Sequence, residues 1–150
     1  MKKEILGMAH EDILESDKDI IGAILKLKKM GYNKIYLQGH SLGCTKIVYT
    51  YNKMLAENKT DLLNLINGIV LLSLIDIPMA LKFYLKENFI KYLNYAEEKQ
   101  IENKDTELMP EESFIHPISV KTFLRYAKEN EEIDFARYGQ DNKLEKLNNI

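Results

Sequence analysis

The stretch that decides the fold is KIYLQGHSLGCTKIVYTY, residues 34–51. Its first five residues carry branched and aromatic side chains, which favour a β-strand. After the segment GHSLG, apolar side chains recur at helical spacing, at Ile47, Val48, Tyr51 and Leu55. The sequence therefore predicts a strand at Lys34–Gln38, a tight turn, and a helix over 42–57.

The turn carries the pattern G-x-S-x-G, with Ser41 between Gly39 and Gly43. A strand, a tight turn and a helix form the context of a nucleophile elbow, in which the serine exposes its Oγ on a strained turn. We expect a positive φ at Ser41, and flanking glycines that leave no Cβ between strand and helix. The N–H groups that begin the helix would face an oxyanion beside Ser41. Ser41 is therefore the predicted nucleophile.

A helix is predicted before this stretch, at 16–30. Ser16 and Asp19 resemble a capping box, and Gly31 supplies a stop signal. The side chains expected to be buried are Ile13, Ile20, Ile24 and Leu27.

A second strand is predicted at Ile66–Ser73, where the apolar run is continuous. Such a run is typical of a strand buried on both faces of a parallel sheet. We expect it to lie beside the first strand, parallel to it, in a right-handed βαβ unit.

After Pro78 the pattern becomes helical. Residues 79–108 predict one long amphipathic helix or two shorter ones, and short helices are expected near Val120–Ala127 and near Asn142–Asn149. We interpret 1–78 as the core segment and 79–150 as a helical cap-like region. The alternative is that these helices simply pack on the sheet.

The composition is that of one globular domain, with 150 residues, 45% hydrophobic and 29% charged. A net charge of -2 lacks a basic signature, which argues against nucleic acid as a partner. No apolar run approaches the roughly 20 residues of a membrane span, and no signal region opens the sequence. The single cysteine, Cys44, suits a reducing compartment, and no cluster has metal-ligand spacing. We expect a cytoplasmic location, no membrane span, no metal and no cofactor.

The segment IYLQGHSLGC, residues 35–44, resembles the elbow of the α/β-hydrolase family, in its esterase-like and acylglycerol-lipase-like members. Residues 108–110 and 117–124 resemble the cap region of the same group. The resemblance covers essentially the whole chain but only about the middle half of a full member. It implies an α/β fold class, a partial α/β-hydrolase fold with parallel strands, a nucleophile elbow and a helical cap-like insertion.

The resemblance also implies site residues and a substrate. Ser41 would be the catalytic nucleophile and the backbone N–H of Leu42 an oxyanion donor, acting on a small-molecule acyl ester. The family orders its triad as serine, acid, histidine, so that the acid and the histidine would follow Ile150. The second oxyanion donor would precede Met1.

Other titratable residues give weaker candidates. His10, which is followed by two carboxylates, and His116 are alternative bases, whereas His40 is expected to point into neighbouring structure. Asp76 either lines the site or caps a turn before the following helix. Cys44 is either a thiol activated at a helix N-terminus or a small residue packed at the junction of strand and helix, and we favour the second.

Two classes of function follow. The first is a serine esterase or lipase-like hydrolase, with an acyltransferase as a weaker variant. The alternative is a non-catalytic fragment of a truncated or split gene, or a pseudoenzyme that binds a partner. Two central strands without neighbours leave open edges, which predicts a homodimer or a complementary chain paired through the sheet edges.

Overall fold

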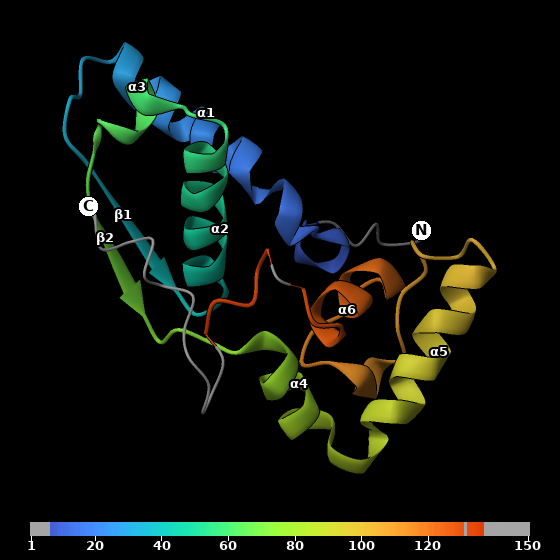
Figure 1. The fold of residues 1–150 in the computed structure, drawn as a ribbon. Coiled ribbons are helices and arrows are strands. Elements are labelled where there is room, and N and C mark those ends of the chain that lie inside the picture. The colour runs from blue at the N-terminus through green and yellow to red at the C-terminus, as the bar shows by residue number, and fades with distance from the viewer. Residues whose placement is uncertain (1–6, 131, 137–150) are drawn as a thin grey trace. The chain divides into compact units, whose positions relative to one another are not determined.

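A computed structural model of the chain describes residues 7–130 and 132–136 (Figure 1). Its residues form two compact units. Among the described residues, the sheet unit comprises 13–76 and 132–136, and the helical unit comprises 7–12 and 77–130. The fold class is α/β, because the sheet unit contains a parallel two-stranded sheet beside its helices.

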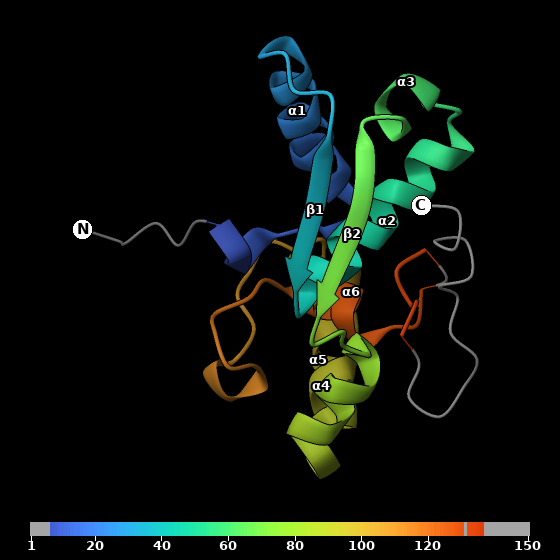
Figure 2. The same cartoon turned by 90° about the vertical axis from the view of Figure 1, so that its left-hand side faces the viewer.

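The two predicted strands pair in parallel and lie side by side, so that this prediction is confirmed (Figure 2). They are β1 (Ile35–His40) and β2 (Ile66–Leu72), joined through α2 (Leu42–Ala56) and the short α3 (Thr60–Leu63). β1 begins and ends later than predicted, because the ladder continues through Gly39 opposite Leu71 and His40 opposite Leu72. One irregularity in the register falls between Ile35 and Tyr36.

Helices cover one face of this sheet. α1 (Ser16–Lys29) and α2 lie behind the strands in Figure 2. The buried core between helices and strands consists of Ile24, Ile35, Tyr51, Met54, Leu62 and Ile66. This core packs the starts of β1 and β2 against α1 and the second half of α2.

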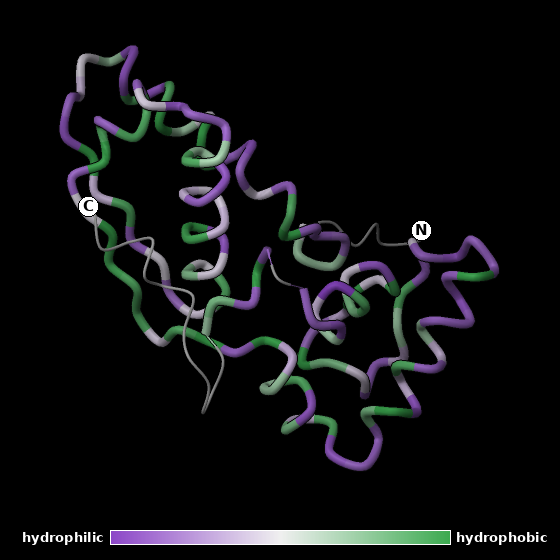
Figure 3. The backbone as a smooth tube through the Cα atoms, viewed as in Figure 1, coloured by the Kyte–Doolittle hydropathy of each residue, from purple (hydrophilic) through white to green (hydrophobic). Residues whose placement is uncertain are grey.

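The other face of the sheet stays open among the described residues. Tyr36 is 68% exposed, and Val70 and Leu72 are also exposed. The expectation that the second strand is buried on both faces is therefore wrong for the described part of the chain. The apolar run itself is plain in Figure 3, where β2 is mostly hydrophobic, but hydrophobicity alone does not supply a second layer of helices.

The start of α1 differs from the prediction. The N-cap position is Glu15, with no side-chain capping bond, and Ser16 is already helical. The Ser16 hydroxyl instead donates to the carbonyl oxygen of Ile13 at 2.6 Å, so the predicted capping box is wrong. The predicted stop is confirmed, because Gly31 has a φ of 90° just after the helix.

The helical unit contains η1 (Gly7–His10), α4 (Ile77–Leu85), η3 (Lys86–Asn88), α5 (Phe89–Ile101), η4 (Glu111–Ser113) and α6 (Val120–Ala127). Of the two readings of 79–108, the one with two shorter helices is confirmed, as is the helix at 120–127. Ser119 caps α6 by accepting a bond from the Thr122 N–H at 3.2 Å. The helix expected near Asn142–Asn149 lies outside the described residues.

The N-terminal segment is fastened to α6. The Thr122 hydroxyl donates to the carbonyl oxygen of Glu11 at 2.8 Å, and Arg125 Nε pairs with Asp12 Oδ1 at 3.1 Å. The Tyr126 hydroxyl donates to Glu11 Oε2 at 3.2 Å. Residues more than a hundred positions apart in the sequence thus hold this unit together.

Candidate functional site

Ser41 occupies the turn between β1 and α2 in a conformation that L-residues avoid. Its φ is 52° and its ψ is -122°, and this ψ lies far from the left-handed helical region. The predicted positive φ is confirmed. The Ser41 N–H donates to the carbonyl oxygen of Leu72 at 2.9 Å, and the Ser41 carbonyl accepts from the Cys44 N–H at 2.9 Å. The turn is therefore held from the neighbouring strand and from the helix.

The two glycines that flank Ser41 are not equivalent. A Cβ on Gly39 would lie 2.7 Å from the backbone nitrogen of Cys44 and 2.7 Å from the carbonyl of Gly43. A Cβ on Gly43 would meet nothing within 4 Å. The predicted close approach of strand and helix is confirmed at Gly39 and wrong at Gly43.

Cys44 is a buried packing residue. Its side chain is fully buried, and its thiol donates to the carbonyl oxygen of Leu72 at 3.1 Å. The Leu72 carbonyl thus receives both this thiol and the Ser41 N–H. The interpretation of Cys44 as a small residue packed between strand and helix is confirmed.

The start of α2 offers hydrogen-bond donors beside Ser41. Leu42 is the first helical residue, and the N–H groups of a first turn have no acceptor within their own helix. No acidic side chain lies in this first turn, so nothing there offsets the positive end of the helix dipole. The role of Leu42 as an oxyanion donor stays a prediction.

Ser41 is half-buried, and its Oγ makes no hydrogen bond within the part of the chain that the structure describes. The adjacent His40 is exposed, so the expectation that it points into neighbouring structure is wrong. His10 in η1 and His116 after η4 are exposed residues of the helical unit. The half-buried Asp76 directly precedes α4.

A second serine with a positive φ was missed in the sequence. Ser73 has a φ of 54° and directly follows β2. Because His40 pairs with Leu72 in the parallel ladder, Ser41 and Ser73 both follow the same pair of strand ends. No flanking glycine or immediate helix marks Ser73, so the sequence carried no signal for it. It provides a natural comparison for Ser41.

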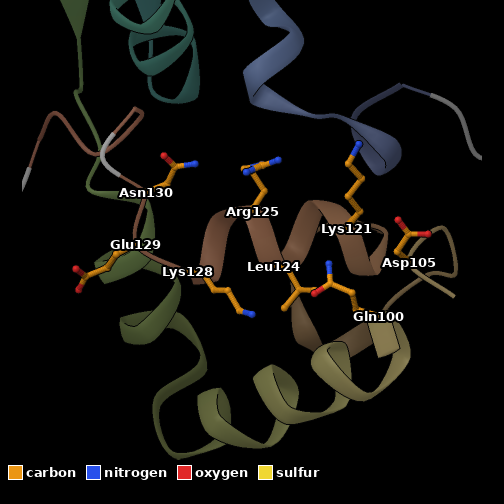
Figure 4. A pocket seen from close by; sticks show the side chains of 8 residues that line it. All are labelled: Gln100, Asp105, Lys121, Leu124, Arg125, Lys128, Glu129 and Asn130. Carbon is orange, nitrogen blue, oxygen red and sulfur yellow. The ribbon is translucent and has the colours of Figure 1, made fainter. Parts of the chain in front are cut away.

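A pocket of about 330 Å³ lies in the helical unit, along α6 (Figure 4). Lys121 and Arg125 point away from α5, and both pair with Asp12, at 3.0 Å and 3.1 Å. Lys128 points toward α5 and pairs with Glu97 at 2.9 Å. Because carboxylates neutralise its cations, this pocket gives no basis for a catalytic assignment.

The described residues contain no group of histidine, cysteine and carboxylate side chains that could hold a metal ion. Within the same residues, no helix has both the length and the apolar character needed to cross a membrane.

Comparison with known proteins identifies no relative: no protein-family model matches the chain, and no curated protein or solved structure matches it either. The functional assignment therefore rests on the local geometry alone.

Proposed function

We propose that this chain carries the nucleophile region of a serine hydrolase that acts on acyl esters, in a partial α/β-hydrolase fold with the helical unit as its cap. Ser41 is the nucleophile, and the N–H of Leu42 is the oxyanion donor. The proposal is supported by one observation above all, the conformation of Ser41 between β1 and α2.

The backbone conformation of Ser41 carries an energetic cost. A non-glycine residue in a sparsely populated backbone region costs about 1–3 kcal/mol. Glycine would avoid most of that cost. Since Ser41 Oγ forms no hydrogen bond among the described residues, local bonding of its side chain does not offset the strain. A chemical use of the hydroxyl is the explanation that we adopt.

The reaction would proceed in two steps. Ser41 Oγ attacks the ester carbonyl carbon, and the carbonyl electron pair moves onto oxygen, where the Leu42 N–H and the α2 dipole stabilise the charge. The intermediate collapses and expels the alcohol, which leaves an acyl group on Ser41, and water then releases the acid. In this reaction class a histidine oriented by a carboxylate carries the proton. His10 and His116 stay alternatives for that role.

A fluorophosphonate probe tests the nucleophile, because Ser41 Oγ would attack phosphorus and displace fluoride. Ser16, Ser113 and Ser119 are buried, so Ser73 is the matched comparison. We expect labelling to concentrate at Ser41, to vanish in Ser41→Ala and to persist in Ser73→Ala. Peptide mapping that finds Ser41 and Ser73 labelled equally would overturn the proposal.

The alternative function, a fragment that binds a partner chain, is favoured by a different observation. The described sheet has two strands, and its open face exposes Tyr36, Val70 and Leu72. Uncovered apolar surface and unpaired strand edges promote association. Light scattering should show dimers or larger species, weakened by Val70→Thr but not by Leu25→Gln, which removes an exposed side chain on α1. A monomer at micromolar concentration would count against this alternative.

A further inference from the structure

The turn between α4 and α5 lies at one end of the helical unit (Figures 1 and 2), and apolar side chains are exposed around it. Phe83 is 80% exposed and Ile90 is 59% exposed. Met79 is also exposed, and it lies one helical turn before Phe83 on the same side of α4. Between these residues, buried side chains recur every four positions and anchor the turn, at Leu81, Leu85 and Phe89. The exposed ones consequently face outward.

The same turn carries lysines without ion pairs, although Lys82 Nζ lies 5.7 Å from the centre of the Phe89 ring and Lys91 Nζ lies 5.1 Å from that of Tyr92. Lys82, Lys86 and Lys91 are exposed, and none forms an ion pair with a carboxylate among residues 7–130 and 132–136. Every other described lysine or arginine of the helical unit is paired, namely Lys99, Lys104, Lys121, Arg125 and Lys128. The uncompensated positive charge of this unit is thus concentrated beside its most exposed aromatic side chain.

The local charge is opposite in sign to that of the whole chain. Residues 77–96 contain three lysines and one glutamate, Glu87, a net charge of +2, whereas the chain carries -2. The segment therefore attracts anionic surfaces that the protein as a whole would repel.

We propose that this α4–α5 turn docks on the surface of anionic phospholipid bilayers. Phe83, Ile90 and Met79 enter the boundary between headgroups and acyl chains, and the lysine ammonium groups remain at the level of the lipid phosphates and carboxylates. The apolar side chains project from a turn, which suits insertion into a soft surface. The lysines without ion pairs are attracted to the negative charge of the bilayer surface. Association of the turn with a second protein chain is therefore the outcome that would contradict the proposal.

The expected strength is modest and depends on charge. Each lysine near an anionic surface contributes about fivefold to the partition coefficient, and burial of one aromatic side chain contributes about tenfold. Salt should weaken the attraction, because the lysines are exposed to solvent.

The chain contains no tryptophan, so Phe83→Trp introduces a single reporter at the turn. We expect its emission to shift to the blue with vesicles of phosphatidylcholine and phosphatidylserine, and to stay unchanged with phosphatidylcholine alone. Ile101→Trp is the matched control, because Ile101 ends α5 at 82% exposure, next to carboxylates rather than to lysines without an ion pair. No blue shift is expected there.

Sedimentation with the same vesicles supplies the second measurement. Phe83→Ser and the triple variant Lys82→Gln, Lys86→Gln, Lys91→Gln should each lose binding by about tenfold or more. Ile101→Ser should bind like the parent chain. Absence of vesicle binding in the parent, or Phe83→Ser binding unchanged, would overturn the proposal. Loss of self-association in Phe83→Ser without vesicle binding in the parent would assign the turn to a protein interface instead.

Discussion

Gly39 packs so closely against the backbone of Cys44 that a Cβ at Gly39 would lie 2.7 Å from the Cys44 nitrogen. Real Cβ atoms do not approach backbone so closely, and the neighbouring atoms at Gly43 and Cys44 belong to the first turn of α2. A side chain at this position must therefore push the strand away from the helix.

Gly39→Ala should destabilise the chain by about 1–3 kcal/mol, the usual range for overpacking. Gly43→Ala is the matched control, because a Cβ there meets no atom within 4 Å and alanine favours helix over glycine by roughly 0.5–1 kcal/mol. Urea unfolding followed by circular dichroism measures both. Equal effects of the two substitutions would show that the close approach at Gly39 is not real.

Ser41→Gly should stabilise the chain, although it removes the proposed nucleophile. Relief of about 1–3 kcal/mol of backbone strain exceeds the roughly 0.5–1 kcal/mol entropic cost of a glycine, for a net gain of about 1 kcal/mol. Ser16→Gly should have the opposite sign, because Ser16 is helical and its hydroxyl bonds to Ile13. A destabilised Ser41→Gly variant would mean that the serine side chain makes contacts of its own.

The isolated chain should hydrolyse short-chain aryl esters very poorly. Ser41 Oγ has no hydrogen-bonded base among the described residues, and loss of triad members typically lowers kcat by several powers of ten. A steady-state assay with Ser41→Ala as reference measures the residual rate. Robust turnover abolished by Ser41→Ala would reveal an active base, and His10 and His116 would be the first residues to replace.

The contact between Tyr126 and the N-terminal segment makes the free energy of unfolding depend on pH in the alkaline range. Burial and the carboxylate of Glu11 raise the pKa of Tyr126 above its ordinary value of 10.0. The folded chain then keeps this proton where the unfolded chain has lost it, so stability is intact below about pH 10 and falls as the pH rises further.

Tyr126→Phe should cost about 1–3 kcal/mol at neutral pH, since it removes the hydrogen bond to Glu11. The difference from the parent chain should shrink above about pH 10. Tyr36→Phe, at an exposed tyrosine, is the control and should show little effect. A difference in stability between Tyr126→Phe and the parent that is independent of pH would contradict a raised pKa at Tyr126.

The sequence predicted the elements around Ser41 well because their signals are local. Gly39 and the β-rich residues before it mark the turn, and Gly31 marks the end of α1. Side-chain bonds were harder to predict. The sequence predicted Ser16 as an N-cap, but its hydroxyl donates to the carbonyl oxygen of Ile13. The reason is that a short 3-10 segment, η2 (Ile13–Glu15), leads directly into α1.

Long-range features could not be predicted from periodicity. The contacts of Thr122 and Arg125 with residues 11 and 12 join parts of the chain that share no local pattern. Burial of β2 was overestimated for a similar reason, because an apolar strand needs a second covering layer that its own residues do not encode. The strain at Ser73 also depends on its place after a paired strand.

The bond from the Ser41 N–H to the Leu72 carbonyl extends the ladder one residue past β1. An amide in a turn ordinarily exchanges its hydrogen with solvent rapidly, but this one is closed by the neighbouring strand. Its exchange rate should therefore follow the opening of the β1–β2 pair, as for the amides inside the sheet. The turn at Ser41 consequently opens together with the end of β2. Any event that pulls the Leu72 carbonyl away from β1 also breaks the hydrogen bond that holds the Ser41 N–H.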